Sequence, residues 1–250
     1  MTVFRSALFL LWFALVTAVM SIAFIPVLVL PWWVCAWMAR QWCRLTFVGL
    51  RVFAGLGYEV RGTAPRDGRV IVASKHMSMW DTMALFMLLW NPATVVKREL
   101  MRIPFYGWYL WKAGMIPIDR SAGASALRKM TAAAEKVFAQ KRPIIIFPEG
   151  TRKKPHAEPD YKPGVAALYG QLDAPCVPVA LNSGLFWTGP GGFLKKRGTV
   201  VIEFLSPIPA GLPRREFMAT LEQRIESATA ALVSEGETLL TRRSSVPVGA

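Results

Sequence analysis

The sequence predicts an α/β protein, with a mostly parallel sheet flanked by helices and with a separate helical hairpin at the N-terminus. Three observations lead to this prediction. No charged residue occurs from Ser6 to Ala39 of the 250-residue chain. After Gly55, short β-rich runs alternate with helical stretches, as in α/β proteins. Several of these runs are continuously apolar, which is typical of strands covered on both faces of a sheet.

The uncharged N-terminal run is long enough to enter a membrane. Ionised groups are costly in hydrocarbon, and an unbroken helix of this length would exceed the bilayer core of about 30 Å. Pro26 and Pro31 interrupt it, because proline lacks the amide donor that a helix needs. We therefore expect a helix over residues 6–25, a bend, and a second helix over residues 32–55, which together form a membrane hairpin spanning residues 1–55.

The second helix combines tryptophans with arginines, a mixture suited to the depth of lipid headgroups. Arg40, Arg44 and Arg51 outnumber Arg5. This excess predicts that the rest of the chain lies on the cytoplasmic face of the cell inner membrane. A single span and a hairpin dipping into one leaflet both fit. A cleaved signal peptide and a soluble core hairpin remain alternatives.

We expect an α/β domain over residues 56–240 and a flexible tail over residues 241–250. Its helices are predicted at residues 123–141, where apolar side chains recur at helical spacing, and at residues 214–234. The predicted strands cover residues 58–61, 70–74, 94–97, 115–118, 144–147, 177–181 and 199–205.

The composition limits the chemical class of the binding partner. The chain is 53% hydrophobic and carries a formal net charge of +14, a pairing that points to an anionic partner such as a membrane surface, a phosphate-bearing substrate or nucleic acid. Cys35, Cys43 and Cys176 show no metal-ligand or disulfide spacing, so we expect packed free thiols, or thiols near lipid, and no metal site.

His76 and Asp81 are five residues apart, directly after a predicted strand. A carboxylate that fixes the tautomer of a neutral imidazole creates a general base. The chain lacks G-x-S-x-G, so the hydroxyl to be activated would belong to a bound substrate. Backbone amides near the start of the helix after Asp81 are candidates for the oxyanion donors. The alternative is that Asp81 only caps that helix.

Two further clusters could bind phosphate. The sequence Phe147-Pro-Glu-Gly-Thr-Arg152 follows a predicted strand and offers close backbone amides, a hydroxyl and a guanidinium fork. Lys97 and Arg98 end another strand and precede an apolar, aromatic turn at residues 103–107. The alternative is an ordinary turn in the first case and an exposed basic strand end in the second.

Taken together, these motifs resemble the 1-acyl-sn-glycerol-3-phosphate (lysophosphatidate) acyltransferase family. The resemblance spans residues 58–205 and includes H-x4-D at His76, the stretch 97–107, the sequence 147–152 and the segment 177–180. It implies the glycerolipid acyltransferase fold and transfer of a fatty acyl group from a thioester, on coenzyme A or acyl carrier protein, to the hydroxyl of lysophosphatidate. The product would be phosphatidate, a phospholipid precursor.

The resemblance also implies roles for individual residues. His76 would be the base and Asp81 its partner. The glycerophosphate would be held by Glu149, Gly150, Thr151 and Arg152, assisted by Lys97 or Arg98, while Val177 and Pro178 would line the acyl or acceptor site.

Lys75 and His156 have none of these roles. Lys75 stands where the family more often has asparagine, and it could tune the imidazole or contact an anionic substrate. His156 has no motif role and is expected to face solvent.

Other functions remain open on the sequence. The acceptor could be another lysophospholipid, glycerol 3-phosphate or a lyso-aminolipid. A non-catalytic, basic, membrane-anchored binding protein is the alternative from a different class. No cofactor is expected beyond the acyl carrier. Nucleic acid is not expected as a partner, because the basic residues are scattered and no recognition motif occurs.

Overall fold

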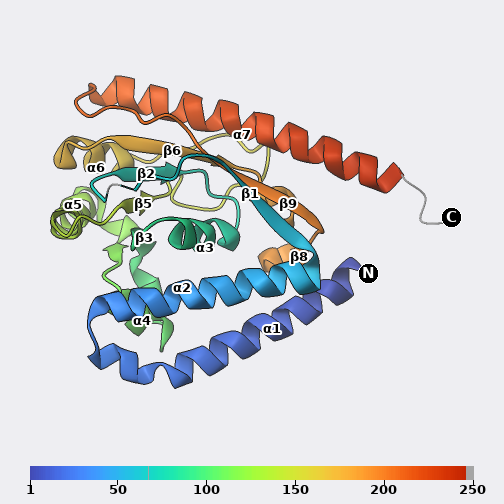
Figure 1. The fold of residues 1–250 in the computed structure, drawn as a ribbon. Helices are drawn as coiled ribbons and strands as arrows, with labels where there is room; N and C mark the ends of the chain where they lie inside the picture. Colours follow the sequence, from blue (N-terminus) through green and yellow to red (C-terminus); the bar gives the residue numbers. More distant parts are fainter. Residues whose placement is uncertain (67, 246–250) are drawn as a thin grey trace.

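The predicted fold class is confirmed. The computed structural model describes residues 1–66 and 68–245, and it has a seven-stranded sheet with helices on both faces (Figure 1). The strand order is β1-β9-β6-β2-β5-β3-β4. The strands are β1 (Leu56–Gly62), β2 (Ile71–Ser74), β3 (Ala93–Lys97), β4 (Ile116–Ile118), β5 (Ile144–Ile146), β6 (Cys176–Leu181) and β9 (Gly198–Phe204).

Each of the seven strand runs predicted from the sequence forms one of these strands. Neighbouring strands are parallel except for β6 and β9, which are antiparallel. The amino ends of β1 and β9 therefore point toward the same edge of the sheet as the carboxyl ends of β2, β3, β5 and β6. We call this the carboxyl edge. A small antiparallel hairpin of β7 (Trp187–Thr188) and β8 (Leu194–Lys195) was not expected from the sequence.

The helices cover the sheet in two layers (Figure 1). The N-terminal layer contains α1 (Thr2–Ala23), the 3₁₀ turn η1 (Ile25–Val29), α2 (Trp32–Gly49) with its π-helical end η2 (Leu50–Ala54), α3 (Met79–Leu88), η3 (Arg98–Arg102) and α4 (Tyr106–Lys112). The opposite layer contains α5 (Gly123–Ala139), α6 (Gly164–Leu172) and α7 (Arg214–Ser245). Three short 3₁₀ turns, η4 (Arg120–Ala122), η5 (Ser183–Leu185) and η6 (Pro190–Gly192), connect the other elements.

Three predicted boundaries were wrong. The helix expected at residues 214–234 continues to Ser245 as α7. The aromatic turn expected at residues 103–107 contains the start of helix α4. The flexible tail expected from residue 241 is helical as far as Ser245, because Leu240 packs against the core and Thr241 Oγ1 donates to the Glu237 carbonyl. Residues 246–250 of that predicted tail lie outside the described residues.

Strand residues alternate between two hydrophobic cores. Val72 and Val177 pack on the side of α1, α2 and α3, whereas Ile71 and Ile144 pack on the side of α5, α6 and α7. This alternation follows from the two-residue period of a strand and requires apolar side chains at every position. Cys35, Cys43 and Cys176 are buried free thiols, as expected.

Helix α1 is docked along its whole length. Phe9 has no exposed surface, and its ring meets the edge of Trp187 at a centroid distance of 5.8 Å. Trp12 Nε1 donates to the carbonyl of Leu45 in α2 at 2.9 Å, and Tyr109 of α4 donates its hydroxyl to the Ser21 carbonyl at 2.8 Å. The hairpin and the sheet therefore share one core.

Replacing Phe9 by Ala should test this docking. The substitution leaves a cavity under α1, so we expect the free energy of unfolding in detergent to fall by about 3–5 kcal/mol. Leu11, which is 68% exposed on the same helix, is the control, and Leu11→Ala should change it by less than about 0.5 kcal/mol. Equal effects of the two substitutions in thermal or chemical unfolding would contradict the docked arrangement.

Candidate active site

His76 lies in the loop after β2, at the carboxyl edge of the sheet. Its Nδ1 is 3.0 Å from Oδ2 of Asp81, which lies in the first turn of α3. The imidazole is 13% exposed, whereas the Asp81 carboxylate is fully buried. The H-x4-D spacing brings the two side chains together because Ser78 ends the loop and begins the helix as its N-cap.

Hydrogen bonds to Asp81 define the tautomer of His76. Oδ2 also accepts from the backbone amides of Met77 at 2.6 Å and Ser78 at 2.8 Å, and the Ser183 hydroxyl donates to Oδ1. Backbone amides can only donate, so this carboxylate acts as an acceptor and the imidazole carries its proton on Nδ1. In the neutral imidazole this tautomer leaves a lone pair on Nε2, which a general base needs.

The capping alternative is also partly correct. Asp81 closes a capping box with Ser78 at the start of α3 and pairs with His76 at the same time. The helix begins at Met79, before Asp81, and the amides of Met77, Ser78 and Trp80 are already bonded to Asp81 or Ser78. The expectation that the amides at this helix start supply the oxyanion donors therefore fails for these three.

The segment from Phe147 to Arg152 packs directly on His76. The rings of Phe147 and His76 are stacked at a centroid distance of 4.0 Å, and the amide of Lys153 donates to the His76 carbonyl at 2.8 Å. Gly150 adopts a positive φ of 64°, and its amide closes the turn onto the Phe147 carbonyl. Two motifs far apart in the sequence thus form one site.

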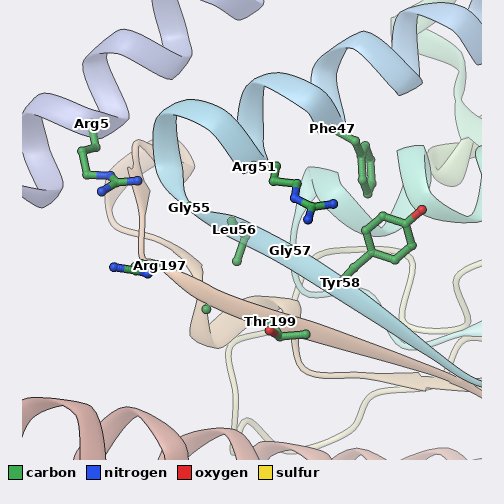
Figure 2. Close-up of a pocket in the computed structure, with 10 residues that line it drawn as sticks. Arg5, Phe47, Arg51, Gly55, Leu56, Gly57, Tyr58, Arg197 and Thr199 are labelled. Carbon is green, nitrogen blue, oxygen red and sulfur yellow. The ribbon is translucent and has the colours of Figure 1, made fainter.

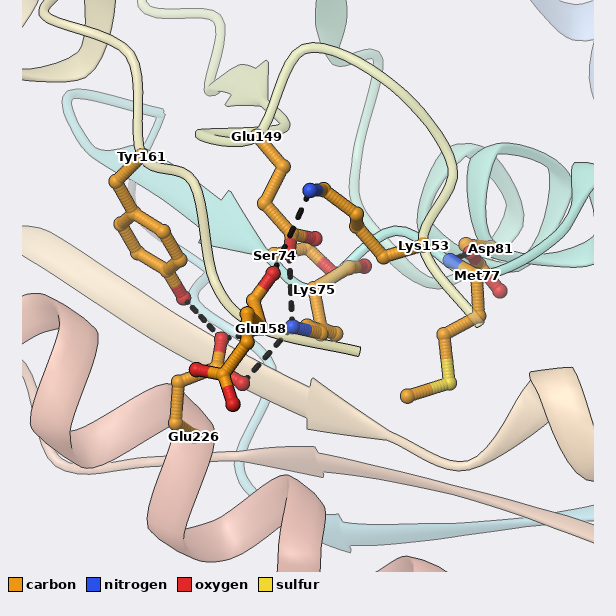
Figure 3. Close-up of polar contacts among 9 residues, drawn as sticks. All are labelled: Ser74, Lys75, Met77, Asp81, Glu149, Lys153, Glu158, Tyr161 and Glu226. Atoms are coloured by element: carbon orange, nitrogen blue, oxygen red, sulfur yellow. Dashed lines mark hydrogen bonds and ion pairs between the residues drawn. The ribbon is translucent and has the colours of Figure 1, made fainter. Parts of the chain in front are cut away.

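A buried ion cluster lies beneath this site (Figure 3). The Nζ of Lys75 is 2.8 Å from Glu149 Oε1 and 2.8 Å from both carboxylate oxygens of Glu226 on α7. The Tyr161 hydroxyl donates to Glu226 Oε1 at 2.9 Å. The side chains of Lys75 and Glu149 are 2% and 0% exposed.

The cluster corrects two sequence-based expectations. The Lys75 ammonium is held by two carboxylates inside the protein, so it is not placed to contact an anionic substrate. The Glu149 carboxylate faces Lys75, so it positions its loop rather than holding a glycerophosphate. Burial raises the pKa of Glu149, and the hydrogen bond and charge of Lys75 oppose this rise.

Basic side chains gather where β3, β4 and β5 end. Lys97 and Arg152 are exposed and carry no ion pair among the described residues, while Arg98 pairs with Asp119 at 2.9 Å. Thr151 is exposed between Gly150 and Arg152. This surface can accept a phosphate.

Arg120, which the sequence reasoning did not select, belongs to the same surface. Its guanidinium carbon would lie 3.4 Å from a Cβ placed on Gly150. It follows β4 by two residues, and Lys97 pairs in register with Ile118 at the end of that strand. The sequence signal that could have identified Arg120 is a basic residue two positions after a predicted strand that ends at the carboxyl edge.

Val177 and Pro178 do not have their expected place. Both are buried within β6, where they pair in register with Val72 and Ala73 of β2. Because β6 is covered on both faces, these side chains support the sheet instead of lining an acyl or acceptor site.

His156 faces solvent as expected. Its imidazole is 65% exposed and lies 2.8 Å from Glu237 of α7. The sequence reasoning also missed Ser183 and Glu226, since neither belongs to a local motif. Both reach the site only through tertiary contacts.

Comparison with known proteins agrees with this geometry. A family model described as acyltransferase matches residues 57–182. The chain is 33% identical over 79% of its length to a 1-acyl-sn-glycerol-3-phosphate acyltransferase of Pseudomonas aeruginosa, covering 77% of that protein. It is 31% identical over 65% of its length to human 1-acyl-sn-glycerol-3-phosphate acyltransferase alpha, covering 59% of that protein.

A solved structure shares the fold. The crystal structure of the 1-acyl-sn-glycerophosphate (LPA) acyltransferase PlsC from Thermotoga maritima superposes with a TM-score of 0.73 at 19% identity. The superposition covers 93% of this chain and 98% of that one, so it includes the N-terminal hairpin as well as the sheet.

The ion cluster should contribute strongly to stability as a unit. Lys75→Met leaves the Glu149 charge buried and unpaired, and we expect a loss of about 3–5 kcal/mol in the free energy of unfolding. Lys75→Met combined with Glu149→Gln should lose less than Lys75→Met alone. The exposed Lys162–Asp160 pair is the control, where Lys162→Met should cost about 1 kcal/mol or less. A double variant as unstable as the sum of the two single variants would refute the pairing.

Proposed function

Since this chain belongs to the lysophosphatidate acyltransferase family, we propose that it moves a fatty acyl group from a thioester donor to the free hydroxyl of lysophosphatidate, giving phosphatidate. The observation that carries the proposal is His76 held by Asp81 beside a cation-rich surface that continues from the Phe147–Arg152 turn. The His76 imidazole can take a proton from an alcohol while the basic surface binds the phosphate of the same molecule.

The reaction follows from the tautomer. Nε2 of His76 accepts the proton of the acceptor hydroxyl as its oxygen attacks the thioester carbonyl carbon. The tetrahedral intermediate then collapses, the carbon–sulfur bond breaks, and the thiolate takes the proton back from the imidazolium. Asp81 stabilises that imidazolium without accepting the proton. The reaction needs no cofactor beyond the acyl carrier, which is coenzyme A or acyl carrier protein.

The phosphate of the acceptor is assigned to Arg152 and Arg120, with Lys97 assisting and the Gly150 and Thr151 backbone close by. A guanidinium group can donate two parallel hydrogen bonds to one phosphate, which defines the orientation of that phosphate. Arg98 is shared with Asp119, which makes it a weaker candidate.

We also propose that the protein is bound to a membrane through one leaflet, with the domain that begins at residue 56 on the cytoplasmic face of the inner membrane. Among the described residues, α1 is the one helix long and apolar enough to cross a bilayer. Its contacts with α2, α4 and Trp187 favour the hairpin over a span, because a spanning helix would give them up.

The outer side of the hairpin supports this arrangement. It exposes large apolar side chains on α1, η1, α2, η2 and α4, which we call the apolar face. Its members include Leu11, Leu15, Val19, Ile22, Val29, Trp33, Trp37, Val48, Val52, Trp108 and Trp111. Lipid substrates could then reach the site without leaving the bilayer.

An acceptor panel tests the reaction. Purified protein in detergent, given labelled acyl-coenzyme A or acyl carrier protein, should acylate lysophosphatidate, and His76→Ala should lower kcat by a factor on the order of 10²–10⁴. His156→Ala is the matched control and should leave kcat unchanged, since the His156 imidazole is 65% exposed and pairs with Glu237 of α7 instead of Asp81. Acylation of glycerol 3-phosphate or of a phosphate-free lysolipid in place of lysophosphatidate would replace the proposed acceptor. Full activity of His76→Ala would refute the base.

The phosphate assignment has its own test. Arg152→Gln and Arg120→Gln should each lower kcat/KM for lysophosphatidate by about tenfold or more, mainly through KM, because each removes a charged hydrogen-bond donor. Lys154→Gln, an exposed cation of the same loop, is the control. If all three variants lose activity equally, the effect is general electrostatics and the specific assignment fails.

A further inference from the structure

A basic cavity lies outside the candidate active site, where α1, η2 and the β8–β9 connection meet (Figure 2). It has a volume of about 810 Å³ and lies beside the first residues of β1 and β9. Its lining includes Arg5, Arg51, Arg197, Tyr58 and Thr199. All three arginines lie outside the residues that the family model matches.

Arg5 and Arg197 come from segments distant in the sequence and approach each other at Gly55, while Arg51 lines the same cavity on the side of Phe47 and Tyr58. A Cβ placed on Gly55 would be 2.8 Å from Arg5 Nη2 and 3.1 Å from Arg197 Cγ. Gly55 has a positive φ of 66° at the end of η2, which turns the chain sharply into β1. Because glycine has no side chain, the space between Arg5 and Arg197 stays open at Gly55.

These guanidinium groups are not neutralised within the described residues. Arg5 Nε donates to the Phe53 carbonyl at 2.9 Å, which leaves its terminal nitrogens free of any acidic partner there. Arg51 and Arg197 are both exposed, and neither forms an ion pair with any residue that the structure describes. Like charges held together without acidic partners repel one another, so a bound anion would stabilise the cluster.

The cavity borders the apolar face. Arg51 lies about one turn after Val48 and directly before Val52, which are 52% and 63% exposed, and Arg5 follows Phe4, which is 68% exposed. A ligand here would therefore meet charge and apolar surface together. This combination fits a lipid headgroup better than a soluble metabolite.

Trp80 separates the cavity from the catalytic pair. Its ring lies 5.4 Å from that of Phe47 and 6.1 Å from that of Tyr58, both of which line the cavity, and Asp81 follows it in α3. The two sites are therefore distinct and share the carboxyl edge of the sheet.

We propose that Arg5, Arg51 and Arg197 form a binding site for the phosphate of an anionic membrane phospholipid, separate from the site that binds the reacting acceptor. The guanidinium forks bind the phosphate oxygens, and the acyl chains lie along the apolar face. The site fixes the hairpin at headgroup depth beside the candidate active site.

Variants that conserve charge distinguish a specific phosphate-binding site from non-specific electrostatic attraction to an anionic membrane. Arg51→Lys combined with Arg197→Lys keeps the net charge but removes two forks. We expect about tenfold weaker binding to vesicles of phosphatidylcholine containing phosphatidate or phosphatidylglycerol, and unchanged binding to phosphatidylcholine alone. Arg128→Lys combined with Arg215→Lys, on exposed positions of α5 and α7, is the control and should bind as wild type. Wild-type binding by the Arg51/Arg197 variant would overturn the proposal.

A second measurement identifies the source of the phosphate. The protein in detergent should bind a short-chain phosphatidylglycerol, which is neither acceptor nor product of the proposed reaction, more tightly than inorganic phosphate, and the Arg51/Arg197 lysine variant should lose that preference. Equal binding of the two by wild type would assign the cavity to free phosphate and overturn the lipid assignment. His76→Ala should bind vesicles as wild type does, so failure of this site and failure of the proposed reaction are distinguishable.

Discussion

The buried ion pair between Lys75 and Glu149 organises the candidate active site. Two charges inside a protein are stable only when each has its partner, so the loop after β2 and the loop after β5 can take one relative position. That position stacks Phe147 on His76 and aligns the neighbouring backbones. Glu226 extends the constraint to α7, a helix beyond the segment that the family model matches. The C-terminal helix therefore contributes to the site although it carries no catalytic group.

The antiparallel pairing of β6 with β9 has a second consequence. It reverses β9 and β1 relative to the rest of the sheet, which brings their amino ends to the edge where β2 and β5 end. The hairpin enters the sheet through β1, so its apolar face and the arginine cavity lie near the catalytic loops. One reversal of strand direction thus places the apolar face and the arginine cavity beside the candidate active site.

Much of the fold could be predicted from the residues, because it rests on local patterns. Short β-rich runs, several of them continuously apolar, predicted the seven strands, and Pro26 and Pro31 predicted the break between α1 and α2. The approach of His76 to Asp81 follows from five residues of local chain. The errors at Glu149, Val177 and Pro178 have a different origin, since a motif shows which residue types are present but not which way each side chain points.

The sequence by itself determined the classes of element, the apolar N-terminal hairpin and the residues available for proton transfer and phosphate binding, because these depend on periodicity and on chemical groups. Only the tertiary structure decided that Lys75 is neutralised by Glu149 and Glu226, that Ser183 supports Asp81, and that Arg5, Arg51 and Arg197 line one cavity. Such contacts join residues separated by tens to hundreds of positions. Their formation depends on strand order and direction, which no local pattern in the chain records.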